Sequence, residues 1–530
     1  MAQQDKNVDC GRNAVGRYRR REPEQSVLYQ VVREQLETFL DRRQDEGRPV
    51  PRFVERELRG FLECGILAHG FVRVYCDACR KSRVVGFSCK RRGFCPSCGG
   101  RRMADTAAWL VDRVIPEVPV RQWVLTLPFP LRFRMAYDAA FTSEMLRIFL
   151  RAVFASLRRR ARRHKKMPGA ECGAVTFVQR FGDALNLNVH FHTLVLDGVY
   201  ESDEGETRFH ELPPPGCKEL ERILRRIVRR IGKLLERRGM EPGAELLAED
   251  QPLLAGLAAA SIRSRIATGR RAGQEVSRRG DRIDPEEMEQ EPNRADCVAG
   301  GGFSLHAGVA VPARDRKRLE RLCRYVARPP VATERLSRLA EGRLLYRLKR
   351  RWRDGTTHRV FESQELLEKL VSLVPPPRAH QVRYHGVLAP CASRRASVIP
   401  GSPRLPGDAL SDSLQPAGQR AAPATPASLP EFESMAAGQP ADPVEAPQEP
   451  PRPPRHGPPG TPRRLSWAEL MRRVFAVDVL KCPDCGGRMR ILAALHDPDA
   501  VRAILESLGL PSRAPPNLPA QPTPDENLFA

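Results

Sequence analysis

Two closely spaced pairs of cysteines place the tightest limit on how this chain can fold. Cys76 and Cys79 form the first pair, Cys95 and Cys98 form the second, and fifteen residues separate them. The segment is short of apolar residues, so it needs a metal ion to fold. Two such pairs supply the four thiolates of a closed tetrahedral zinc site. The spacing therefore predicts structural Zn²⁺ bound by these four cysteines.

Further cysteines leave the ligand set open. Cys64 and Cys89 flank the two pairs and can replace a ligand or help to form a second site. Cys482 and Cys485 form a third pair within CPDCGGRMR, which repeats the earlier CPSCGGRRM. This third pair either takes ligands from Cys64 or Cys89, takes them from another subunit, or is the remnant of a lost site.

The chain carries a large surplus of positive charge. Its 88 Lys and Arg residues outnumber 64 Asp and Glu residues, which gives a formal net charge of +24. Lys and Arg that neutralise phosphates release counterions, so nucleic acid is the first partner to expect; a solvated basic surface is the alternative. Basic residues crowd around the cysteine pairs, and we expect four of them to contact DNA: Arg91, Arg92, Arg101 and Arg102.

Hydrophobic segments give no sign of a membrane protein. No uninterrupted apolar run approaches the ~20 residues that span a bilayer. The polar start of the sequence also lacks the apolar stretch of a signal peptide. We therefore expect a cytoplasmic protein with no membrane partner.

Helical and extended patterns alternate along the chain, which favours an α+β fold. Helices are expected over 26–43, 103–115, 138–163, 218–238 and 313–328. Strands are expected from 121, and over 173–181, 186–200 and 302–311, with 173–181 and 186–200 forming a hairpin. The last helix has Asp315 as its N-cap and Pro329 as its stop.

Composition divides the chain into six predicted parts. Pro, Ala, Gly and Ser dominate from about 397 onward, which is typical of an extended linker. The parts are an N-terminal helical segment (1–60), a zinc-binding and DNA-binding domain (61–115), a core with a helical insertion near 200–300 (116–395), a disordered Pro-rich linker (396–463), a small C-terminal module with the third cysteine pair (464–511) and a disordered tail (512–530).

Residues 186–192 hold the pattern that is most informative for chemistry. Side chains alternate along a strand, so polar and apolar residues here fall on opposite faces. Asn186, Asn188, His190 and His192 share one face, and Leu187, Val189 and Phe191 line the other. Two imidazoles side by side can bind one metal ion, whereas a pair of packed or exposed histidines is the alternative.

Tyr325 is the second candidate for chemistry. Its helix has an apolar face, and Arg318, Arg321 and Arg328 flank the tyrosine at helical spacing. An arginine-lined tyrosine can meet a phosphate group. A tyrosine packed at the helix edge beside solvated arginines is the alternative.

Five motifs in order carry a family resemblance: FSCKRRGFCPSC, WVLTLP, LNLNVHFHTLVLDGVY, LCRYVARPP and VRYHGVLAP. Together they resemble the insertion sequence 91 family of rolling-circle transposases. Those enzymes are single-strand nucleases with a His-hydrophobic-His (HUH) motif and an N-terminal zinc-binding domain. The resemblance covers roughly residues 60–395 and the C-terminal CPDCGGRMR segment.

The resemblance implies an HUH nuclease core, in which an antiparallel sheet with flanking helices presents the histidine pair on a central strand. His190 and His192 would bind a catalytic Mg²⁺ or Mn²⁺. A third polar ligand is usual in the family. Gln179, on the preceding strand, is the first candidate and Asn188 is the second.

The resemblance also implies that Tyr325 is the nucleophile. It would attack single-stranded DNA at the ends of a mobile element, form a 5′-phosphotyrosine, release a 3′-OH and later join the strand to target DNA without ATP. Arg321 and Arg328 would contact the DNA, and His306 would contribute a proton, a phosphate contact or only core packing. The expected place of action is the nucleoid in the bacterial cytoplasm.

One departure from the family pattern concerns the number of tyrosines. Some members carry two tyrosines four residues apart, but Arg321 and Pro329 stand at those positions here. Either a second subunit of a homo-oligomer or repeated use of Tyr325 is then required, and Tyr346 and Tyr384 are alternative nucleophiles. The functional alternatives are a plasmid replication initiator or relaxase, and a zinc-dependent DNA-binding regulator with an inactive core.

Overall fold

The computed structural model describes residues 20–167, 169–203, 206–239, 251–280, 297–352, 354–400 and 464–521. All of these belong to one unit, which is built from the two stretches 1–402 and 464–530. The predicted linker at 396–463 therefore lies outside the described residues, except for its first five positions. The same holds for the end of the predicted tail, from 522 onward.

A six-stranded antiparallel sheet carries the centre of the structure, in the order β14-β4-β5-β3-β10-β9. Its strands are β3 (Val120–Thr126), β4 (Gly173–Phe181), β5 (Leu187–Leu196), β9 (Cys297–Gly300), β10 (Phe303–Val311) and β14 (Val382–Gly386). The expected hairpin is confirmed, because β4 and β5 are adjacent. Strand β3 lies on the other side of β5, so the histidine-bearing strand is central.

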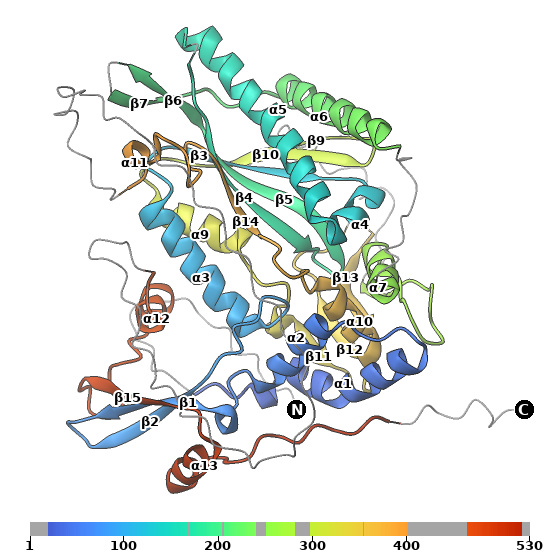
Figure 1. Cartoon of the computed structure of the whole chain (residues 1–530), viewed down its shortest axis with the longest axis vertical. Helices are drawn as coiled ribbons and strands as arrows, with labels where there is room; N and C mark the ends of the chain where they lie inside the picture. The colour runs from blue at the N-terminus through green and yellow to red at the C-terminus, as the bar shows by residue number, and fades with distance from the viewer. Residues whose placement is uncertain are drawn as a thin grey trace, which may run out of the picture. The chain divides into compact units, whose positions relative to one another are not determined.

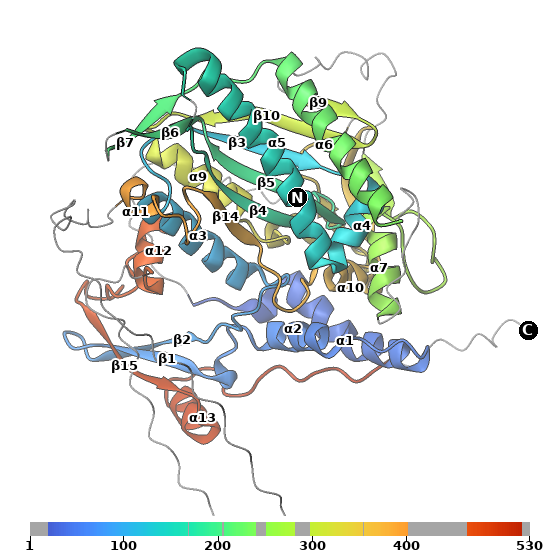
Figure 2. The same ribbon diagram turned by 45° about the horizontal axis from the view of Figure 1, so that its top comes forward.

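One face of this sheet is covered by α4 (Phe129–Tyr137), α5 (Ala139–Lys165) and α6 (Cys217–Arg237), as Figures 1 and 2 show. Leu187, Val189 and Phe191 of β5 point to this side, where the ring of Phe191 stacks 6.2 Å from that of Phe149. Since strand side chains alternate, His190 and His192 face the opposite side.

The opposite face is covered by α3 (Pro96–Arg113) and α9 (Arg316–Val326) (Figure 1). Val175, Phe177 and Leu194 from the sheet pack there against Leu319 and Leu322 of α9. Helix α9 begins as expected, because the Asp315 side chain accepts a hydrogen bond from Arg318 N at 2.9 Å. This packing holds α9 against the face that carries the histidines.

A second core includes the first two α-helices of the described chain. It joins α1 (Val27–Asp45), α2 (Arg52–Glu63), α7 (Pro252–Ile262) and α10 (Ser363–Leu373) to a four-stranded sheet. The sheet has the order β11-β12-β13-β8 and consists of β8 (Ser277–Gly280), β11 (Leu336–Arg338), β12 (Leu344–Arg347) and β13 (Thr356–Phe361). The chain also forms four short helical elements: η1 (Pro23–Gln25), η2 (Leu67–His69), η3 (Thr333–Arg335) and α11 (Arg395–Val398).

A three-stranded sheet joins the two ends of the chain. Strand β1 (Phe71–Cys76) lies between β2 (Lys81–Gly86) and β15 (Met489–Leu495). The β1 and β15 strands pair antiparallel from Phe71 with Leu495 to Cys76 with Met489. The C-terminal segment also forms α12 (Trp467–Phe475) and α13 (Pro498–Ser507).

Three details differ from the expected elements. Helix α3 begins at Pro96 rather than 103, because proline suits the first helical turn and Cys95 stands just before it. The 200–300 region contains a hairpin of β6 (Gly198–Asp203) and β7 (Glu206–Glu211) as well as helices. Among the described residues, no helix is both long and apolar enough to cross a membrane.

Candidate active site

The two histidines of β5 lie side by side and point their outer ring nitrogens at each other. His190 Nε2 and His192 Nε2 are 3.0 Å apart, and both side chains are buried. Two ligands bound at right angles to one ion at about 2.1 Å are also about 3.0 Å apart. The observed spacing therefore fits two imidazoles that share a metal ion.

Hydrogen bonds at the inner nitrogens hold each ring in place. His190 Nδ1 donates to the carbonyl oxygen of Asn188 at 2.8 Å, which leaves a lone pair on Nε2. Gln122 Nε2 lies 2.7 Å from His192 Nδ1. An amide nitrogen only donates, so binding of a metal ion at His192 Nε2 requires the Gln122 amide to turn and place its oxygen at Nδ1. Such a partner behind a metal-binding histidine fixes the ring orientation.

Burial keeps both histidines neutral. It lowers the pKa of His190 to about 4, and it lowers the pKa of His192 well below the ordinary value. Nearby Arg328 lowers both pKa values further. Neutral imidazole is the form that binds a metal ion, so the pair is ready for one at neutral pH.

Gln179 is the better of the two candidates for a third ligand. It pairs with His190 across β4 and β5, and its Nε2 donates to the carbonyl oxygen of Val326 at 3.2 Å. Its Oε1 is buried and has no hydrogen-bond partner among the described residues. By contrast, the Asn188 Oδ1 accepts a hydrogen bond from Arg132 at 3.1 Å. A free, buried amide oxygen beside two neutral imidazoles fits a divalent ion.

Tyr325 lies next to the histidine pair and is open to solvent. Its ring is 6.2 Å from the ring of His192, nearly perpendicular to it, and the residue is 38% exposed. The alternative tyrosines lie elsewhere. Tyr346 is buried in the second core, and the half-buried Tyr384 is on the edge strand β14, opposite Val175.

Two cations cover the Tyr325 ring. The guanidinium of Arg328 lies 4.4 Å from the ring centre and Lys349 Nζ lies 4.3 Å from it. Burial lowers the pKa of Arg328, but the guanidinium group is so strongly basic that the side chain stays charged at neutral pH. The expected arginine Arg321 is exposed on α9. Positive charge thus collects where a phosphate would approach the phenol.

The cysteines form two clusters, and neither is the predicted set. The first cysteine cluster is Cys64, Cys89, Cys95 and Cys98, and the second is Cys76, Cys79, Cys482 and Cys485. The prediction of one site from Cys76, Cys79, Cys95 and Cys98 was therefore wrong in its grouping. The reason is that β15 pairs with β1 and brings the third cysteine pair to the first, while Cys64 and Cys89 lie beside the start of α3.

The first cysteine cluster has the dimensions of a zinc site. Its Sγ atoms are separated by 3.7 Å (Cys64 and Cys98), 3.3 Å (Cys89 and Cys98) and 3.6 Å (Cys64 and Cys95). Four thiolates around one zinc ion are about 3.8 Å apart. Three of the four cysteines are buried, as in a structural site.

The arginines near the first cysteine cluster have different surroundings. Arg102 donates to the carbonyl oxygens of Lys90 and Arg91, and Arg92 donates to that of Ala379. Arg101 is exposed, and the Arg91 side chain lies against Gly60 of α2. Arg92 and Arg102 therefore have structural contacts of their own, and DNA binding by these arginines remains a prediction.

Sequence reasoning missed Gln122 and Lys349. Gln122 has a signal in hindsight, because it directly precedes the WVLTLP motif on the same strand and is polar. Lys349 comes from the loop after β12 and has no pattern in the sequence that connects it with Tyr325.

Two family models match the chain. Residues 31–127 match a transposase zinc-binding domain, and residues 173–396 match a putative transposase. No curated protein and no solved structure matches the chain. The first match contains the whole first cysteine cluster, which supports structural Zn²⁺ there, and the second contains the histidine pair and Tyr325. With both domains in this order on one chain, the protein belongs to the insertion sequence 91 family of transposases.

Proposed function

We propose that this transposase nicks and rejoins single-stranded DNA at the ends of a mobile element through a covalent bond between Tyr325 and a 5′ phosphate. It would act on DNA in the bacterial cytoplasm. The observation that supports this best is the exposed tyrosine ring 6.2 Å from the ring of His192, with a free amide oxygen on the neighbouring strand. Nucleophile and metal ligands thus come together from α9, β5 and β4.

His190, His192 and Gln179 would hold the divalent ion, Mg²⁺ or Mn²⁺. When bound, such an ion supplies a Lewis acid that polarises the scissile phosphate. The protein holds its ligands ready: Gln122 and the Asn188 carbonyl fix the two rings, and Val326 fixes the Gln179 amide. Because Val326 follows Tyr325 directly, the same hydrogen bond ties the nucleophile's helix to the ligand strand.

The bonds exchanged in the proposed reaction balance without water or ATP. Tyr325 Oη forms a bond to phosphorus while the bond from phosphorus to the 3′ oxygen breaks. The phenol loses its proton, and the departing 3′ oxygen gains one. One phosphodiester replaces another, so the reverse reaction can join the 3′-OH of a different strand.

Arg328 and Lys349 would stabilise the phosphate during this exchange. Both lie over the tyrosine ring, where their charges can meet the phosphate oxygens. Arg328 also lies 5.2 Å from the ring centre of Phe181, which restricts its position. A preorganised cation costs less to align than a mobile one.

A single tyrosine per site sets a requirement for a complete cycle. Among the described tyrosines, Tyr325 is the one in ring contact with the histidine pair. Strand exchange between element ends and target DNA then needs a second subunit or repeated use of Tyr325.

The test is covalent capture of labelled single-stranded DNA taken from the ends flanking the gene. We expect an adduct on a denaturing gel with Mg²⁺ or Mn²⁺, none with a chelator and none with Tyr325→Phe. Tyr384→Phe is the matched control and should form the adduct normally. An adduct formed by Tyr325→Phe would overturn the assignment of the nucleophile.

The alternatives predict different outcomes in the same assay. A DNA-binding regulator with an inactive core would bind the DNA in a salt-sensitive manner without forming an adduct. A replication initiator or relaxase would form the adduct with plasmid origin sequences and not with element ends. The match to a putative transposase favours the element ends.

A further inference from the structure

The second cysteine cluster brings together residues from opposite ends of the chain. Cys76 ends β1, Cys79 lies in the following turn, and Cys482 and Cys485 precede β15. Cys76 Sγ is 3.5 Å from Cys485 Sγ, and Cys79 Sγ is 3.6 Å from Cys482 Sγ, across 403 residues of sequence. All four sulfurs lie within 4.8 Å of one another. A disulfide would bring two sulfurs to about 2.05 Å, whereas four zinc-bound thiolates lie about 3.8 Å apart.

The backbone repeats one local conformation beside the cysteines of both clusters. In the second cluster, Arg80 after Cys79 has φ 58° and Gly486 after Cys485 has φ +76°. In the first cluster, the residues after Cys64 and Cys89 also have positive φ, at 88° and 54°. A non-glycine residue with positive φ is uncommon and needs support from its surroundings. The shared conformation indicates that the second cluster is built like the first.

Gly487 shows how tightly the backbone closes around the sulfurs. A Cβ at Gly487 would lie 3.3 Å from Cys485 Sγ and 3.4 Å from Cys76 Sγ. The Gly487 amide also donates to Cys485 Sγ at 3.4 Å. Hydrogen bonds from the backbone stabilise a charged thiolate, which is the form that binds a metal ion.

Few apolar side chains pack directly around the four sulfurs. The apolar cluster here consists of Val74, Met489 and two of the cysteines themselves, with three partly buried neighbours. The ion pair between Arg83 and Asp484, at 3.0 Å, is substantially exposed. Exposed ion pairs contribute about 0–1 kcal/mol each. The larger apolar contact between the two ends of the chain lies away from the sulfurs, where Phe71 packs with Val501 and Leu505 of α13. The turns that carry the cysteines therefore have few contacts of their own and need a metal ion to hold them.

We propose that Cys76, Cys79, Cys482 and Cys485 bind a second Zn²⁺ ion, which joins the C-terminal segment to the N-terminal β1–β2 hairpin. The ion closes a link between residues about 400 positions apart in sequence. In this proposal Cys482 and Cys485 share their ion with Cys76 and Cys79 of the same chain. They are then neither the remnant of a lost site nor ligands to an ion of another subunit.

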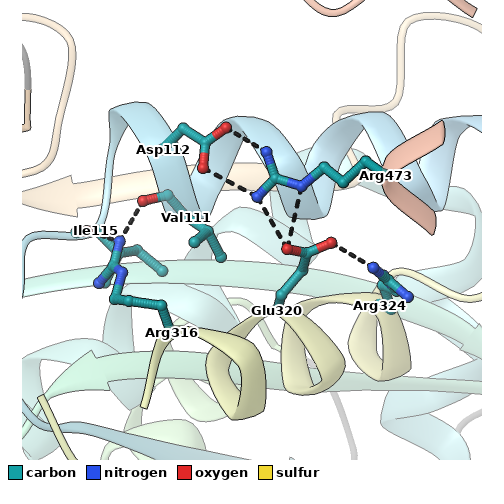
Figure 3. A network of polar contacts seen from close by, with 7 residues as sticks. All are labelled: Val111, Asp112, Ile115, Arg316, Glu320, Arg324 and Arg473. Carbon is teal, nitrogen blue, oxygen red and sulfur yellow. Dashed lines mark hydrogen bonds and ion pairs between the residues drawn. The ribbon is translucent and has the colours of Figure 1, made fainter. Parts of the chain in front are cut away.

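The link also brings α12 to the helix that carries Tyr325 (Figure 3). Arg473 of α12 bonds Asp112 of α3, with Nη2 2.9 Å from Oδ1, and Glu320 of α9, with Nη2 2.8 Å from Oε2. Arg324 pairs with Glu320 from the same helix. The C-terminal segment therefore docks both on the hairpin and on the α3–α9 pair.

Zinc content of the full-length protein tests the proposal. We expect two zinc ions per chain in the native protein and one in the double variant Cys482→Ser/Cys485→Ser. The matched control Cys217→Ser/Cys391→Ser removes two exposed cysteines outside both clusters and should keep two ions. One ion in the native chain, or two in the Cys482/Cys485 variant, would overturn the proposal.

A second measurement uses no ligand variants, so it does not depend on their folding. A specific protease site inserted within 403–463 allows the native chain to be cut between its two described stretches. After cutting, the two fragments should elute together while zinc is bound, and should separate at a lower urea concentration when zinc is removed, since strand pairing and the α13 contacts remain. Separation at the same urea concentration with and without zinc would contradict the metal link. Neither readout depends on DNA cleavage.

Discussion

The two faces of β5 bury different kinds of side chain. On one face Phe191 is fully buried against Phe149 of α5, as in any hydrophobic core. On the other face His190 and His192 are nearly as buried, yet they are polar and neutral. Burial of a polar group costs free energy unless it is partnered. The difference indicates that Phe191 stabilises the fold, whereas the two histidines are buried polar groups that packing alone does not require.

The largest effect on stability is expected from the apolar face. Phe191→Ala removes a fully buried ring and should lower the free energy of unfolding by about 3–5 kcal/mol. Denaturant unfolding measures this directly. A loss below about 1 kcal/mol would show that this face is not the core that we describe.

The polar face should respond in activity instead. His190→Ala is expected to reduce adduct formation by about 100- to 1000-fold, because it removes a metal ligand worth several kcal/mol. Its effect on unfolding should be smaller than that of Phe191→Ala. His164→Ala, at an exposed position on α5, is the control and should leave adduct formation unchanged. If His190→Ala kept full activity, the histidine pair would be a packing feature.

Gln122 should give a smaller effect. Gln122→Leu removes the hydrogen-bond partner of His192 but keeps the side-chain volume, so metal-dependent activity should fall by about 10- to 100-fold. Part of this loss should be recovered at higher Mn²⁺ concentration, since the ligand itself remains. An equal loss at every metal concentration would indicate a role other than ring orientation.

The smallest expected effect is a pH dependence of stability in the presence of a chelator. The folded pKa of His190 is about 4, below the ordinary value near 6.5, so the unfolded chain binds more protons between these values. Stability contributed by neutral His190 is present above about pH 6.5 and is lost as pH falls toward 4. We expect wild type to lose roughly 1–2 kcal/mol more than His190→Ala between pH 7 and pH 5.

The comparison variant for this prediction is Phe191→Ala. It should lower the free energy of unfolding by the same amount at every pH, so that the change of this free energy with pH stays as in the wild type. The same slope for wild type and His190→Ala would contradict a buried, neutral histidine.

Much of the sheet and its helices could be predicted from local sequence patterns. Alternation placed His190 and His192 on one face of their strand, and helical spacing with the Asp315 cap placed the helix of Tyr325. These features depend on neighbouring residues, so periodicity contains them.

The grouping of the cysteines could not be predicted in this way. Cys76 and Cys79 lie close to Cys95 and Cys98 in sequence, but strand pairing with β15 joins them to Cys482 and Cys485. The position of Lys349 over Tyr325 could not be predicted either, because it depends on how separate elements of the chain pack together. Spacing counts residues along the chain and contains no information on such long-range contacts.

The most direct test of the central claim is to identify the residue that carries the DNA. Wild-type protein is allowed to form the adduct, digested with protease and nuclease, and analysed by mass spectrometry for the peptide that bears a 5′-linked nucleotide. The account predicts a single modified peptide that contains Tyr325. A nucleotide on Tyr384, Tyr346 or a non-tyrosine residue would contradict it.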